Sequence, residues 1–152
     1  MNDGSTRSSA AGALPYPGLR PFRTDEAEIF FGREEHTDQL LAKLQTTHFL
    51  AVIGVSGCGK SSLVRAGLIP ALRTGLIGSA GGRWRIAELR PGDRPRARLA
   101  AALAAERILS GERYEDPASI ALIEATLRKG PLGLTELLRE LPPPPNTNIL
   151  IF

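Results

Sequence analysis

The chain has 152 residues, of which 42% are hydrophobic and 23% are charged, and its formal net charge is +3. This composition is typical of a water-soluble globular chain that is long enough for one ordinary domain with a sizeable core. It excludes a helical membrane protein, because no apolar run approaches the roughly 18 residues of a span. The single cysteine, Cys58, excludes an internal disulfide.

The N-terminal part predicts a tail, an extended lead-in and two helices. Residues 1–13 are small and polar and lack the apolar stretch of a signal peptide, so we expect a disordered tail and a cytoplasmic protein. The prolines and glycine of YPGLRPF, residues 16–22, predict an extended lead-in. The next segment predicts a short helix with Thr24 as N-cap and Gly32 as its stop. From Glu34 to Gln45, apolar residues at helical spacing predict a second helix.

Two strands and a helix are expected in the middle of the chain. The segment HFLAVIG, residues 48–54, is a continuous apolar run that ends in glycine, as buried parallel strands do. A helix with an apolar stripe is expected to begin at Lys60, and Pro70 is expected to break or kink it. Residues 74–82 are interpreted as a loop, and RWRIAEL, residues 83–89, as the second strand.

The remaining chain predicts three helices and a last strand. A helix is expected over about Pro95 to Leu109, and a second one is expected between an N-cap at Asp116 and a stop at Gly130. Leucines at residues 134–141 predict a short third helix, and NILIF, residues 148–152, predicts a strand. Strands that alternate with helices favour an α/β fold, a three-layer α/β/α sandwich with a mostly parallel sheet.

A basic stretch has two possible interpretations. Six arginines between Arg83 and Arg98 face only Glu88 and Asp93. A patch of this kind can bind nucleic acid. We favour a solvated rim, with arginines near a phosphate site, and expect no nucleic-acid partner, because the stretch lacks the repeated aromatic residues that stack on bases.

The stretch GVSGCGKSS, residues 54–62, has the spacing G-x-x-x-x-G-K-S of the phosphate-binding loop of P-loop NTPases, the Walker A motif. Its glycines permit unusual backbone conformations and close approach to phosphate, and the amides at the start of the next helix attract an anion. Lys60 can reach the β- and γ-phosphates and is the candidate catalytic residue, while Ser61 can bind Mg²⁺. The residues expected to bind ATP here are Gly54, Val55, Ser56, Gly57, Cys58, Gly59, Lys60, Ser61 and Ser62.

Other reactive side chains carry less information. A thiol at the mouth of a helix, such as that of Cys58, can be reactive, but a role for its backbone alone is the simpler interpretation. His36 and His48 have no spacing typical of metal ligands.

The loop alone would also suit a transporter ATPase of the ABC class, but its flanks are more specific. The segments LPYPGLRPF, IFFGREEHTDQLLAKL, FLAVIGVSGCGKSSLVRAGLIPALR and WRIAELRPGDRP together resemble the bacterial novel STAND group of signalling NTPases, which are relatives of AAA+ ATPases. The resemblance covers about residues 14–152, which we interpret as the N-terminal portion of the NTPase domain.

This resemblance implies a site for the base as well. In the family, a segment of two hydrophobic residues followed by Gly-Arg-Glu helps to hold adenine, and here it corresponds to Phe30, Phe31, Gly32, Arg33 and Glu34. The competing interpretation is a hydrophobic staple that leads into a helix, with Arg33 paired to an acid.

The resemblance further implies ATP-dependent switching in signal transduction, self-association in the ATP state, and a C-terminal sensor region that is often a WD-repeat propeller. We expect the chain to be truncated before the Walker B acids, so that it binds ATP but barely hydrolyses it, since neither Glu88 nor Asp93 is a convincing substitute. Two alternatives stay open: a freestanding P-loop ATPase or kinase fragment, and an interaction domain with a vestigial nucleotide site.

Overall fold

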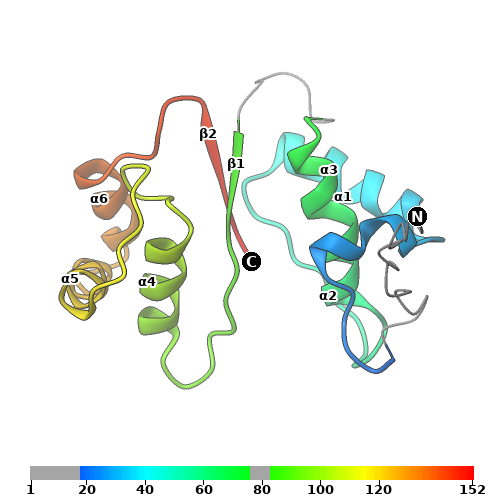
Figure 1. The fold of residues 1–152 in the computed structure, drawn as a ribbon, viewed down its shortest axis with the longest axis horizontal. Coiled ribbons are helices and arrows are strands. Elements are labelled where there is room, and N and C mark those ends of the chain that lie inside the picture. The colour runs from blue at the N-terminus through cyan, green and yellow to red at the C-terminus, as the bar shows by residue number, and fades with distance from the viewer. Residues whose placement is uncertain (1–17, 76–82) are drawn as a thin grey trace, which may run out of the picture. The chain divides into compact units, whose positions relative to one another are not determined.

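The computed structural model describes residues 18–75 and 83–152 (Figure 1). The expected N-terminal tail and most of the loop expected at residues 74–82 lie outside these ranges. The chain divides into two compact units, Met1–Leu68 and Ile69–Phe152. The candidate phosphate loop belongs to the first unit.

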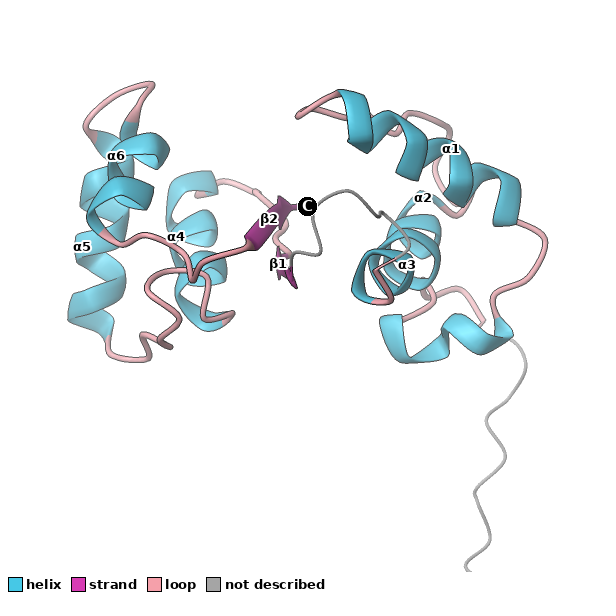
Figure 2. Ribbon diagram, turned by 90° about the horizontal axis from the view of Figure 1, so that it is seen from above, coloured by secondary structure: helices cyan, strands magenta, loops and turns pink. Residues whose placement is uncertain are grey.

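Helices dominate the described chain, and two short strands form its sheet (Figure 2). None of the helices within the described ranges has the length and apolar character needed to cross a membrane. In chain order the elements are the 3-10 helix η1 (Thr24–Ile29), α1 (Glu34–Thr46), α2 (Lys60–Ser62), the π-helical stretch η2 (Leu63–Leu68), α3 (Ile69–Arg73), β1 (Arg83–Ala87), α4 (Pro95–Ala105), α5 (Pro117–Arg128), α6 (Gly133–Glu140) and β2 (Thr147–Ile151).

The first short helix is present, but it is a 3-10 helix and its predicted cap is wrong. Thr24 is its first residue, and Arg23 is the N-cap. The Glu26 carboxylate accepts a hydrogen bond from the Arg23 N–H at 2.8 Å, so an acid inside the helix replaces the expected threonine hydroxyl. The helix ends at Ile29, and the chain turns at Gly32, whose φ is +77°. A positive φ of this size is the reason that glycine suits this position.

Helix α1 agrees with the predicted helix and packs close to η2. Leu40 and Leu41 of its apolar stripe are buried. Its contact with η2 depends on Gly67, since a Cβ atom at this residue would lie only 2.5 Å from Thr37 Oγ1. The missing side chain therefore lets the two helices approach.

The strand predicted at residues 48–54 is wrong. These residues have no β pairing, and Phe49 and Ile53 expose 83% and 91% of their surface. A strand needs a neighbour that takes up its backbone N–H and C=O groups, and the described part of the first unit contains no strand. The apolar run indicates side chains that favour burial in a sheet, but it does not specify a neighbouring strand, which depends on the tertiary structure.

The helix after the loop begins at Lys60, as predicted, but Pro70 does not break it. Helical structure continues to Arg73, and the six residues Leu63–Leu68 before the proline adopt the π-helical register. Proline lacks an N–H and its ring crowds the preceding turn. The wider π register accommodates this crowding with a change of hydrogen-bond pattern in place of a break.

The sheet of the second unit is parallel, as predicted for its two strands. Arg83 of β1 pairs with Thr147 of β2, and the register continues to the pair Ala87 and Ile151. Beyond the strands, the Leu89 N–H donates to the Phe152 carbonyl at 2.7 Å. This α-helix-rich unit with its small parallel sheet is consistent with an α/β NTPase-like fold.

Helix α4 packs beside the sheet of the second unit, α5 packs on α4, and α6 packs on α5, so that the core lies among them. In both views, α4 lies between the strands and α5 (Figures 1 and 2). The buried side chains of this core come from β1, from the three helices and from the loop after α4; they are Ala87, Ala100, Leu103, Ala104, Ile108, Leu109, Ile123, Leu127 and Leu137.

Helix α4 is shorter than predicted, because it ends at Ala105 and not near Leu109. Arg107 has a positive φ of 53°, which is incompatible with a continuing right-handed helix. The Arg113 Nε–H donates to the Ala105 carbonyl at 3.1 Å and satisfies an acceptor that the helix end leaves free. Ile108 and Leu109 are fully buried in the loop that follows α4. Their apolar character therefore reflects burial in the core and not a continuing helix.

The two C-terminal helices agree with their signals. The Asp116 carboxylate accepts a hydrogen bond from the Ser119 N–H at 2.7 Å, and Pro117 is the first residue of α5. The Ser119 side chain and backbone lower the pKa of the Asp116 carboxyl. The helix ends at Arg128, just before the predicted stop at Gly130.

Candidate functional site

The glycines of the candidate loop have two separate structural roles. Gly57 and Gly59 have φ values of +80° and +86°, a backbone region that favours glycine. Gly54 has a steric role, because a Cβ atom there would lie 2.8 Å from Cys58 Sγ. The loop therefore favours glycine at the two positions that the motif fixes, Gly54 and Gly59, and also at Gly57 between them.

The Lys60 side chain folds back over its own loop. Its Nζ donates hydrogen bonds to the carbonyls of Gly54 at 2.9 Å and Val55 at 2.8 Å. Nζ also lies 3.9 Å from Cys58 Sγ. The ammonium group is thus held by neutral acceptors at the loop, and hydrogen bonds to an anion, in which both partners are charged, would be stronger than these.

The start of α2 offers further donors. Gly59 is the N-cap residue and makes no side-chain cap, while its carbonyl accepts the first helical hydrogen bond from the Leu63 N–H at 2.8 Å. Free amides and the positive end of the helix dipole favour an anion at this position. The two serines that follow differ in burial, since Ser61 is half-buried and Ser62 is buried.

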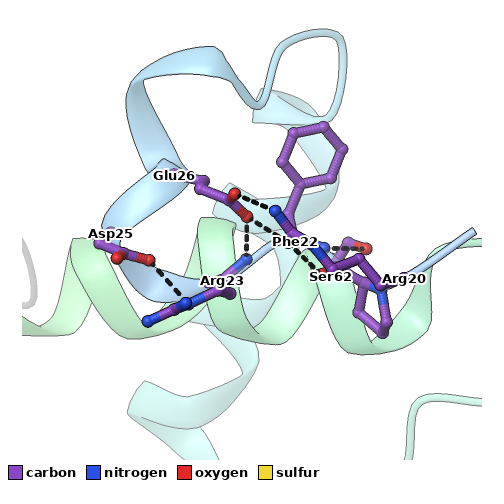
Figure 3. A network of polar contacts seen from close by, with 7 residues as sticks. Arg20, Phe22, Arg23, Asp25, Glu26 and Ser62 are labelled. Atoms are coloured by element: carbon purple, nitrogen blue, oxygen red, sulfur yellow. Dashed lines mark hydrogen bonds and ion pairs between the residues drawn. The ribbon is translucent and has the colours of Figure 1, made fainter. Parts of the chain in front are cut away.

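Ser62 joins the lead-in to this helix, a contact that sequence reasoning missed. Its Oγ accepts a hydrogen bond from the Phe22 N–H at 3.1 Å (Figure 3). The rings of Phe22 and Phe30 pack with centroids 5.3 Å apart. Phe30 Cε1 would lie 3.6 Å from a Cβ atom at Gly67. Phe30 therefore packs against the helix, whereas Phe31 exposes 77% of its surface.

The lead-in is also held by an ionic cluster around Glu26 (Figure 3). The Arg20 guanidinium donates to both oxygens of the Glu26 carboxylate, with an Nη1–Oε2 distance of 2.8 Å. The hydrogen bond from Arg20, and then that from the Arg23 N–H, lower the pKa of Glu26 to about 2. A second ion pair joins Arg23 to Asp25 at 3.2 Å. Together these contacts organise the turn that leads into η1.

The predicted adenine segment meets the phosphate loop at one residue. Arg33 Nη2 donates a hydrogen bond to the Cys58 carbonyl at 3.1 Å, so the arginine contacts the loop backbone and not an acid. The Glu34 carboxylate instead accepts a hydrogen bond from the Gly32 N–H at 3.0 Å. Backbone N–H groups of Glu34 itself and of Gly32 lower the pKa of the Glu34 carboxyl.

Gly32 itself has a conformational role and no packing role. Its φ is +77°, and nothing lies within 4 Å of a Cβ atom placed on it. The segment thus has an exposed ring at Phe31, a turn at Gly32, and an arginine, Arg33, that contacts the loop. The close contact between α1 and η2 supports the position of Arg33 at the start of α1. The sequence signal for this contact is Gly67, a glycine within the apolar stripe of the helix after the loop.

The arginine-rich stretch contributes to a cavity in the second unit. Arg83, Trp84 and Arg85 of β1, with Arg73 and Glu106, line a cavity of 390 Å³. Arg90, Arg94, Arg96 and Arg98 are exposed and are not among its lining residues. The stretch is therefore divided between a cavity and the surface. In the part of the chain that the structure describes, no group of three or more histidine, cysteine or acidic residues could hold a metal ion.

Comparison with known proteins identifies the family of this chain. A family model described as Novel STAND NTPase 1 matches residues 15–152. Neither the comparison with curated proteins nor that with solved structures gives a match. The family match includes the lead-in, the glycine loop and both strands. The chain belongs to the Novel STAND NTPase 1 family.

Proposed function

We propose that this chain is the ATP-binding module of a STAND-type signalling NTPase and that Mg-ATP binds at residues 54–62. The observation that carries the proposal is the position of Lys60 Nζ on the Gly54 and Val55 carbonyls of a glycine loop that begins a helix. A cation at this place and free amides at the helix start are what a polyphosphate requires.

The described residues fit the phosphates and the ion. Lys60 would bind the β- and γ-phosphates, and the loop amides from Gly54 to Gly59 would surround them. The Ser61 hydroxyl would bind Mg²⁺, and Ser62 would lie near the α-phosphate. The ion, when bound, neutralises charge on the β- and γ-phosphates. Val55, Ser56 and Cys58 would contribute backbone groups, because their side chains are not needed for this chemistry.

The base would lie near the segment Phe31 to Arg33. The exposed ring of Phe31 offers an apolar face to a purine. Gly32 has the positive φ of the turn between this ring and Arg33, and Arg33 contacts the phosphate loop. The contact between Arg33 and the Cys58 carbonyl supports a common site for base and phosphates.

The proposal extends to the wider protein through the family. We propose that residues 14–152 are the N-terminal portion of a three-layer α/β/α P-loop domain; the parallel pairing of β1 with β2 supports the parallel sheet of such a domain. ATP would drive self-association and signal transduction in the cytoplasm, under control of a C-terminal sensor region such as a WD-repeat propeller. Catalysis also needs a residue that positions the attacking water. We expect hydrolysis by these 152 residues to be slow, because neither Glu88 nor Asp93 is a convincing candidate for that role.

A titration tests the proposal directly. The 152-residue chain is titrated with fluorescent ATP, with and without Mg²⁺, while phosphate release is followed in parallel. Saturable binding that Mg²⁺ strengthens, with little phosphate release, is the expected result. No saturable binding would favour the interaction domain with a vestigial site, and rapid turnover would favour the freestanding ATPase.

A further inference from the structure

We infer that Arg33 is a positioning residue for the phosphate loop. Its side chain holds the Cys58–Gly59 peptide so that the Gly59 N–H faces the bound phosphate. The inference rests on the proposed nucleotide site and assigns Arg33 to the phosphate side of it. It differs from a contact with adenine, which the resemblance alone implies for this segment.

The hydrogen bond of Arg33 determines which way this peptide faces. Arg33 Nη2 donates to the Cys58 carbonyl at 3.1 Å. Because a trans peptide is planar, its C=O and the N–H of the next residue point in opposite directions, and the described chain contains no cis peptide. The Gly59 N–H therefore points away from the guanidinium.

The peptide needs such a restraint because glycines lie on both sides of Cys58. Rotating the Cys58–Gly59 peptide changes ψ of Cys58 and φ of Gly59, and glycine accepts φ values of either sign. Gly59 has a φ of +86° in the structure. Without Arg33, the loop would spend part of its time with the Gly59 N–H turned away from the phosphate, and binding would have to overcome this loss of order.

Arg33 is itself held by the helix that it caps. Its carbonyl accepts hydrogen bonds from the Thr37 N–H at 3.0 Å and from the Thr37 hydroxyl at 3.1 Å. Thr37 Oγ1 fits into the space left by Gly67, where a Cβ atom would lie 2.5 Å away. Arg33 thus precedes the first turn of α1, and α1 packs against η2 in the helical stretch that follows the loop.

The two roles of Arg33 predict different ligand dependence. A residue that orients a loop amide affects every ligand with phosphates, whether or not the ligand has a base. A residue that contacts adenine affects ATP alone. Comparing ATP, GTP and inorganic triphosphate therefore separates the roles.

The experiment measures binding of Mg-ATP, Mg-GTP and Mg-triphosphate by calorimetry to the parent chain, Arg33→Met, Arg33→Lys and Lys43→Met. Lys43 is an exposed cation near the other end of α1, so its variant controls for the loss of one positive charge. Arg33→Met should weaken all three ligands by the same factor, about fivefold for one solvent-exposed hydrogen bond. Arg33→Lys should recover part of this loss, and Lys43→Met should match the parent.

Two further measurements, on Thr37→Val and on the Gly59 N–H, test the same role if Arg33→Met folds poorly. Thr37→Val keeps the shape against Gly67 but removes the hydroxyl that holds Arg33, so it should weaken the three ligands equally and by a smaller factor. In amide NMR spectra, the Gly59 N–H should respond to triphosphate in the parent and respond less in Arg33→Met. A loss confined to ATP, or affinities equal to those of the parent, would overturn the inference. A parent chain that binds neither ATP nor triphosphate would instead refute the proposed function, and the inference with it.

Discussion

Ser62 Oγ accepts the Phe22 N–H at 3.1 Å, which joins the lead-in to the first turn after the phosphate loop across forty positions of sequence. A serine that the motif places near the phosphates is therefore also the anchor of the segment before η1. Neighbouring Ser61 has no such hydrogen bond with the described residues of the lead-in, 18–22. The two serines can consequently be separated by experiment.

Ser62→Ala should lower stability more than it lowers nucleotide affinity. The change leaves the part-buried Phe22 N–H without its acceptor, which costs about 1–3 kcal/mol. Urea unfolding followed by circular dichroism measures this cost. Ser61→Ala is the matched control, and it should leave the urea midpoint near that of the parent while it reduces the Mg²⁺ dependence of ATP binding. Equal midpoints for Ser62→Ala and the parent would show that the contact contributes nothing to stability.

The cluster around Glu26 should make the lead-in sensitive to acid. The hydrogen bond from Arg20 lowers the pKa of Glu26 from the ordinary 4.5 to about 2. A carboxyl whose pKa is lower in the folded state stabilises that state above the unfolded pKa, and this contribution is lost as the pH falls from about 4.5 to 2.

Urea midpoints of the parent and of Glu26→Gln, measured from pH 7 down to pH 2.5, test this. The parent should be the more stable at neutral pH, and the difference should shrink below about pH 4.5. Comparison of the two chains removes the contributions of Glu34 and Asp116, whose pKa values are also lowered. A difference that stays constant over the whole range would contradict the role of the ionised carboxylate.

Lys60→Ala should weaken ATP binding by roughly ten- to a hundredfold, because a charge-assisted hydrogen bond contributes about 1.5–3 kcal/mol. In the structure its Nζ donates to the exposed Gly54 and Val55 carbonyls and lies 3.9 Å from Cys58 Sγ, so the variant also loses these contacts within the loop. The labelled-ATP titration gives the change, with Lys43→Ala as the charge control. Parent-like affinity in Lys60→Ala would remove the phosphate-binding assignment.

The sequence predicts those parts of the fold and of the site that depend on local residue patterns. Helices α1, α5 and α6 and strands β1 and β2 follow from residue spacing, from the Asp116 cap and from a parallel pairing of apolar strands. The strand expected at residues 48–54 failed because its existence depends on a partner that no local pattern specifies. The contacts of Arg33 with Cys58 and of Phe22 with Ser62 link residues 25 and 40 positions apart, so only the fold could reveal them.

Gly32→Val should reduce ATP binding and spare inorganic triphosphate. A β-branched residue is strained at a φ of +77°, although no neighbouring atom would collide with its Cβ. Strain of about 1–2 kcal/mol should displace the turn that presents Phe31. The comparison of the two ligands by calorimetry checks this, and Arg33→Met should show the opposite pattern of losing both. Unchanged ATP affinity in Gly32→Val would remove the segment from the base site.

The exposed apolar segment before the loop should make this chain self-associate. Phe49, Ile53 and Val55 expose 83%, 91% and 77% of their surfaces, and the backbone between Phe49 and Val55 has no strand partner among the described residues. Unpaired backbone beside apolar side chains invites pairing with a second chain. Ile53→Ser should therefore shift sedimentation toward the monomer at the concentrations where the parent associates.

The matched control for this shift is Leu122→Ser, which removes an apolar side chain that exposes 70% of its surface on helix α5. Because the backbone of α5 is already hydrogen-bonded within the helix, this change should leave association as in the parent. Ile53→Ser should also keep the urea midpoint of the parent, since the side chain makes little contact in the folded chain. If both serine variants reduce association equally, general surface hydrophobicity is the cause, and the unpaired segment has no special part in it.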